Sequence, residues 1–152
     1  MDYLIPAVAG LVATIFMSAF MSGVTRFRLA NADMIHAIGS LFTKEKANAT
    51  VPGLLVHLFS GMGFAYLYAA AISIFPISLL ASLCVGAMMG GFHGIAVAFV
   101  LVALVAENHP LQEFRDAGGQ VSVSHFLGHV IYGAILGSVI GFTGFDLLAR
   151  LR

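Results

Sequence analysis

Histidine is the residue type in this sequence with the greatest capacity for chemistry, because four of its six histidines fall inside long apolar runs. An ionisable side chain within a membrane span is costly and usually faces the bundle interior or a water-filled cavity. Neutral imidazoles there can bond to backbone carbonyls and hydroxyls, or can ligate a metal or a haem iron. The four residues are His57, His93, His125 and His129.

Spacing places two of these histidines together. His125 and His129 are four residues apart, so they share one face of a helix, and that face continues into Gly133. One interpretation is purely structural, in which each imidazole bonds to a carbonyl or to a nearby hydroxyl such as that of Tyr66 or Tyr132.

Two cofactor interpretations remain open beside the structural one. Haem b could be ligated axially by His57 and His129, each of which is followed four residues later by a glycine that would leave room for the macrocycle. A transition metal, whether copper, zinc or iron, could instead be held by several side chains on neighbouring helices. That metal set is His93, His125 and His129 with Glu107.

The elements that must position these side chains are membrane helices. Of 152 residues, 60% are hydrophobic and only 9% are charged, against about 25% in an average soluble domain. The charges cluster, and the apolar runs between them are long enough to cross a hydrocarbon layer of about 30 Å. The sequence therefore predicts one integral membrane domain over residues 1–152, an all-α bundle of four transmembrane helices at about 3–23, 52–74, 77–106 and 121–148.

The connections suggest further structure. The turn near 75–76 is short, so helices 52–74 and 77–106 are expected to form an antiparallel hairpin. The loop 25–51 carries apolar residues at helical spacing, which indicates a short interfacial helix or a loop packed over the bundle. The His-x3-Gly pattern at His57 and His129 also suggests a pseudo-repeat of two hairpins, the first two helices and the last two.

Two predicted helices carry glycines at every fourth position. Small residues on one face let two membrane helices approach closely. Counting inward from the helix ends near 106 and 121, we expect antiparallel packing in which Gly86 faces Gly141; the alternative is self-association with another copy. The ladders comprise Gly86, Gly90 and Gly94 in one helix and Gly133, Gly137 and Gly141 in the other.

Lysine and arginine counts predict orientation. The two long loops carry five of these residues and the C-terminal end carries two. The positive-inside rule then places the long loops in the cytoplasm and both termini outside. The first apolar run begins with acidic Asp2 and is long for a signal peptide, so it is expected to remain as a helix.

The chain resembles a loosely defined group of uncharacterised bacterial four-helix membrane proteins. The features that carry the resemblance extend over most of the chain. The group has no established activity, so the resemblance implies topology and assigns no site roles. We expect the chain to lie in the bacterial inner membrane. These features are segment 9–14 with Met17, His57-x3-Gly61, Gly90-x2-His93 and segment 129–137.

No catalytic residues are predicted, because no nucleophile–base pair and no phosphate-binding glycine loop is recognisable. The net charge of zero gives no sign of a nucleic-acid partner. We therefore expect a non-catalytic accessory or assembly subunit of a larger bacterial membrane complex, in contact with lipid and with other subunits or copies. The alternatives are a protein that binds haem b or a transition metal, in electron transfer or metal handling, and a small oligomeric transporter or channel.

Overall fold

Four long helices form the body of the protein. The computed structural model describes residues 2–100, 105–116 and 118–151, and no strand occurs among them. All four helices are long and apolar enough to cross a membrane. They are α1 (Leu4–Arg26), α3 (Thr50–Ile72), α4 (Leu79–Val100) and α6 (Gly119–Thr143).

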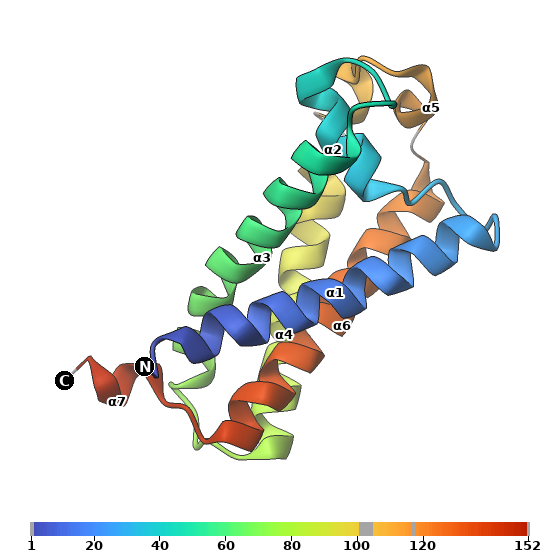
Figure 1. The fold of residues 1–152 in the computed structure, drawn as a ribbon. Helices are drawn as coiled ribbons and strands as arrows, with labels where there is room; N and C mark the ends of the chain where they lie inside the picture. Colours follow the sequence, from blue (N-terminus) through green and yellow to red (C-terminus); the bar gives the residue numbers. More distant parts are fainter. Residues whose placement is uncertain (1, 101–104, 117, 152) are drawn as a thin grey trace.

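Helix α6 lies at the centre of the packing. It packs most extensively on α4 and also on α1, and α1 in turn packs on α3 (Figure 1). Helices α3 and α4 contact each other far less, although they follow one another in the chain. The antiparallel hairpin expected for 52–74 and 77–106 is therefore not confirmed by packing between the two helices.

Three shorter helices cover the two ends of the bundle. Helix α2 (Met34–Thr43) packs on α3 and lies with α5 (Gln112–Arg115) at one end, whereas α7 (Leu147–Arg150) lies with both termini at the other end (Figure 1). The carboxylate of Asp33 caps α2 by accepting a hydrogen bond from the amide of His36. A helix thus exists in the loop 25–51, while its position at a membrane surface stays a prediction.

The ends of the long helices differ from the expected ones by a few residues. Helix α6 ends at Thr143 instead of near 148, because Gly144 adopts a left-handed conformation with φ of 65°. Glycine adopts this conformation without the steric cost that a Cβ brings, and it commonly ends helices. Asp146 then caps the separate helix α7. The part of the expected helix 77–106 at 101–104 lies outside the described residues.

The two glycine ladders face each other across the contact between α4 and α6. A Cβ built on Gly86 would lie closer than 3.0 Å to the carbonyl oxygen of Gly133, and a Cβ on Gly133 equally close to that of Gly86. The register differs from the expected one, in which Gly86 faced Gly141. Gly141 instead lies against Leu79, with 2.8 Å between its added Cβ and the Leu79 Cα.

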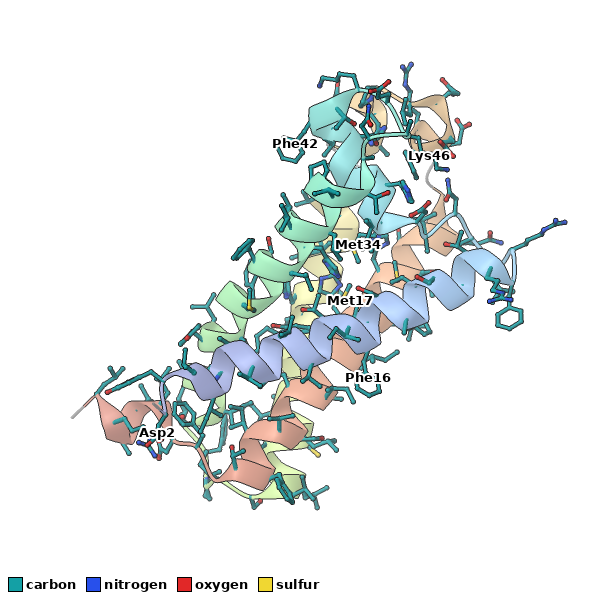
Figure 2. All side chains as sticks on the ribbon, in the orientation of Figure 1. Asp2, Phe16, Met17, Met34, Phe42 and Lys46 are labelled. Carbon is teal, nitrogen blue, oxygen red and sulfur yellow. The ribbon has the colours of Figure 1, made fainter. Side chains whose placement is uncertain are left out.

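Glycines also mediate the other helix contacts. In the α1–α3 contact, a Cβ on Gly10 would lie 2.6 Å from the Cβ of Ala65. In the α2–α3 contact, a Cβ on Gly53 would come closer than 3.0 Å to the carbonyl oxygen of Ile35. Helix α1 has an outer and an inner face. Figure 2 shows that Phe16 projects away from the bundle, whereas Met17 lies inside it and is 2% exposed.

Candidate functional site

The α4–α6 contact brings two of the membrane histidines together. His93 precedes Gly94, and the backbone of Gly94 lies against α6 so closely that an added Cβ would sit 3.1 Å from the Cβ of His129. The imidazole rings of His93 and His129 meet edge to face, with 4.6 Å between their centroids. The glycine contact therefore positions this pair near the middle of the bundle.

His125 and His129 both bond to the backbone of their own helix. The Nδ1 atom of His125 lies 2.9 Å from the carbonyl oxygen of Val121, and that of His129 lies 2.8 Å from the carbonyl oxygen of His125. A carbonyl oxygen only accepts hydrogen bonds, so Nδ1 must carry the proton in each neutral ring. Each Nε2 atom is therefore left with a lone pair and acts as an acceptor.

His57 is the third imidazole of this region, and it comes from α3. The residue is buried, with 8% of its surface exposed. Within the described part of the chain, its Nε2 atom is buried and has no hydrogen-bond partner. A buried polar atom without a partner is rare in native proteins and costs about 1–3 kcal/mol, which makes it a candidate for contact with something besides the protein.

The three imidazoles line one cavity of about 160 Å³ within the bundle. Met17 and Met34 contribute thioether side chains to its wall, and both are buried (Figure 2). Tyr132 also lines it, and its hydroxyl donates to the carbonyl oxygen of Gly61 over 2.5 Å. The remaining lining residues are Thr14, Ile38, Ser60, Gly61, Phe64 and Val97.

The hydroxyl of Tyr132 links α6 to α3, two helices that otherwise contact little. Tyr132→Phe removes this bond and leaves the carbonyl of Gly61 with one partner fewer, so we expect the free energy of unfolding to fall by about 0.5–1.5 kcal/mol. Unfolding in mixed detergent micelles, followed by circular dichroism, measures the change. Tyr66→Phe is the matched control, because its hydroxyl bonds to Tyr3 at an exposed end of the bundle. An equal loss in both variants would contradict the bridging role.

A second cavity lies at the end of the bundle that carries α2 and α5. It has a volume of about 450 Å³, and His125 is among its lining residues. His109 holds its wall together, because its Nδ1 accepts from the amide of Leu111 and its Nε2 donates to the carbonyl of Ala37 over 3.0 Å. Lys46 pairs with Glu113 over 2.7 Å across the same end. The loop before α6 is thus tied to α2.

The structure brings together only part of the predicted cofactor sites. Among the described residues, no group of three or more histidine, cysteine, aspartate or glutamate side chains is arranged to hold a metal ion. Glu107 is exposed, so the metal set with His93, His125 and His129 has no carboxylate shown beside its imidazoles. His57 and His129 do share the cavity, whose volume of 160 Å³ is below the roughly 300 Å³ at which small-molecule sites begin.

Sequence reasoning missed one residue of this region. Tyr68 is 2% exposed, and its hydroxyl lies 3.1 Å from Nδ1 of His93, so it fixes the ring of a cavity histidine. Its ring also packs edge to face on that of Tyr132, with 5.3 Å between the centroids. An available signal was that Tyr68 and His57 are eleven residues apart, about three helical turns, which places them on the same side of α3.

No protein-family model matches the chain, and no curated protein or solved structure matches it.

Proposed function

We propose that this chain is a non-catalytic accessory or assembly subunit of a larger bacterial membrane complex. The observation that carries the proposal is a glycine on the outer face of a membrane helix. Gly63 of α3 is exposed, and a Cβ built on it would meet nothing within 4 Å. Each glycine described above at a helix contact lets two helices of this chain approach closely. Gly63 has no such neighbour, so it could let a helix of another protein approach α3 in the same way.

The chemistry of the buried histidines supports the same proposal. The rings of His125 and His129 donate to carbonyls of their own helix, and His109 ties the end loop to α2. These bonds use the imidazoles to satisfy and link backbone segments. Because these polar groups stabilise the chain's own fold, a role as packing surface in an assembly suits the chain better than a role as a reaction centre.

The proposed placement is the bacterial cytoplasmic membrane with both termini outside. The end of the bundle with α2 and α5 carries Lys44, Lys46 and Arg115, and α1 ends there with Arg26. An excess of lysine and arginine favours the cytoplasmic side. This orientation would expose the 450 Å³ cavity to the cytoplasm.

Gly63→Leu tests the proposed subunit role. Leucine at this position points into open space in the isolated chain, so the fold should be retained while the approach of a partner helix is blocked. We expect the natural chain to co-purify with its partner from native membranes. In Gly63→Leu, the amount of co-purified partner should fall by at least nine tenths. Gly23→Leu on α1 is the matched control, because an added Cβ there also meets nothing within 4 Å. Retention of the partner by Gly63→Leu would refute the proposed contact, and purification of the natural chain as a lone monomer would refute the subunit role.

A small transporter is the second candidate, and the two cavities favour it. His125 lines the larger cavity at the bundle end, while His129, one turn along α6, lines the smaller cavity inside the bundle. A solute could pass from one to the other beside these two rings. Uptake or release of a solute by vesicles containing only this chain would favour transport over the subunit role.

A further inference from the structure

The cavity inside the bundle has its mouth between α3 and α4. Ser60 and Phe64 of α3 line it and are exposed, and His93 and Val97 of α4 line it and are partly exposed. The backbones of α3 and α4 contact each other little, and this side is closed by side chains, chiefly the ring of Phe64 packed on that of His93 with 4.5 Å between the centroids. In a membrane the mouth therefore faces acyl chains, and a molecule dissolved in the bilayer can reach the cavity without crossing water.

The hydrogen-bonding groups inside the cavity define the chemistry of an occupant. The Nε2 atom of His129 is an acceptor, since Nδ1 of that ring carries the proton. The Nε2 atom of His57 is buried, in a residue that is 8% exposed, and has no partner in the described chain. An occupant that satisfies His129 must donate a hydrogen bond, and an oxygen of the same group can accept one from His57 in its Nε2–H tautomer.

Size limits the occupant further. At roughly 30 Å³ for the liquid volume of one water, 160 Å³ holds about five water-sized groups. That is enough for a small headgroup and the first few carbons of a chain, but not for a phospholipid headgroup with its glycerol. Phe64 and Val97 at the mouth are apolar and suit the continuation of an acyl chain toward the bilayer.

We propose that this cavity binds the O–H headgroup of a single-chain lipid, either a protonated long-chain fatty acid or a long-chain alcohol, whose tail leaves between α3 and α4. The headgroup hydroxyl donates to Nε2 of His129, and an oxygen of the headgroup accepts from Nε2 of His57, which then carries the proton of that ring. An ester or a quinone carries no hydroxyl and leaves the acceptor of His129 unpaired. This site is independent of the proposed subunit role, because it uses the interior of the chain and not the outer face at Gly63.

Native mass spectrometry of the full chain in detergent micelles tests the site with three probes of equal chain length. These are palmitic acid, hexadecanol and methyl palmitate, the last of which has the same chain and no O–H. We expect at least one of the first two to give a single adduct at tenfold or more the level of methyl palmitate. An adduct with only the acid or only the alcohol then identifies which of the two lipid types the site binds. Equal adducts with the ester, or no adduct with any probe, would overturn the proposal and leave the cavity to water.

Two variants locate the adduct. Ser60→Leu places a larger apolar side chain at the exposed mouth, so it should reduce the adduct at least tenfold without disturbing the core. His57→Leu removes the unpartnered nitrogen and should act similarly. Gly63→Leu adds the same bulk three residues further along α3, outside the cavity lining, and should leave the adduct unchanged. An adduct that persists in Ser60→Leu would place the lipid elsewhere and overturn the proposal. The subunit role is tested separately, and it fails if the natural chain purifies from its membranes as a lone monomer.

Discussion

Gly86→Ala is expected to lower the free energy of unfolding by about 3 kcal/mol, the upper end of what overpacking a well-packed core usually costs. The added methyl group would lie closer than 3.0 Å to the carbonyl oxygen of Gly133 and 3.1 Å from the Cα of Gly137. Both neighbours are backbone, which cannot rotate away as a side chain can, so α4 and α6 would have to separate. Alanine favours helix over glycine by about 0.5–1 kcal/mol, so a net loss would reveal the steric term. Unfolding in mixed micelles measures it.

Gly91→Ala provides the control for this experiment. Gly91 lies on the same helix, and an added Cβ would meet only the ring of Phe126 at 3.7 Å, which is ordinary van der Waals contact. The control should therefore be neutral or slightly stabilising. A similar loss in Gly86→Ala and Gly91→Ala would show that α4 tolerates no alanine in general, and no loss in Gly86→Ala would refute the close α4–α6 contact.

Gly53→Ala is expected to detach α2 from the bundle while the four long helices stay folded. A Cβ at this position would lie closer than 3.0 Å to the carbonyl oxygen of Ile35 and 3.0 Å from the amide nitrogen of Gly39. Separating α2 from α3 is the local response, and we expect a cost of about 1–3 kcal/mol in the stability of that contact. Hydrogen exchange of the α2 amides measures it, because exchange should become at least several-fold faster in α2 and stay unchanged in α6.

The matched control for α2 is Gly63→Ala, which lies on the same helix and meets nothing within 4 Å. It should leave α2 exchange at the natural rate. Unchanged protection of α2 in Gly53→Ala would contradict the glycine-mediated crossing, and uniform loss of protection in every helix would show that α2 and the bundle unfold as one unit.

The four long apolar helices could be predicted because runs of about 20 apolar residues, the length needed to cross a membrane, are readable in the sequence itself. The register of the glycine ladders could not. Its prediction depended on helix ends placed near 106 and 121, and the ladders themselves do not fix how far one helix is displaced along the other, because both repeat every four residues. The expected and the observed contacts differ by eight residues, about two helical turns, since Gly133 and not Gly141 lies against Gly86.

The candidate site was predicted as a set of residue types and only partly as a place. The shared face of His125 and His129 followed from their spacing, but which groups each ring would bond was left open, and the structure gives backbone carbonyls. The cavity itself depends on how α3 and α4 diverge, and the turn at 73–78 carries no signal for that divergence. The contact of Gly53 with Ile35 was also missed, because the two residues lie in separate helices whose crossing point no periodicity encodes.

The most direct test is native mass spectrometry of the chain purified from its own membranes at natural expression, combined with metal analysis and an absorption spectrum. If the imidazoles stabilise the fold and the chain is a subunit of an assembly, the mass spectrum should show a complex of fixed stoichiometry with a larger membrane protein. Neither haem absorption nor stoichiometric copper, zinc or iron should then belong to this chain. A stable lone monomer would contradict the subunit role, and a Soret band or bound metal lost in His129→Ala would contradict the structural role of the histidines.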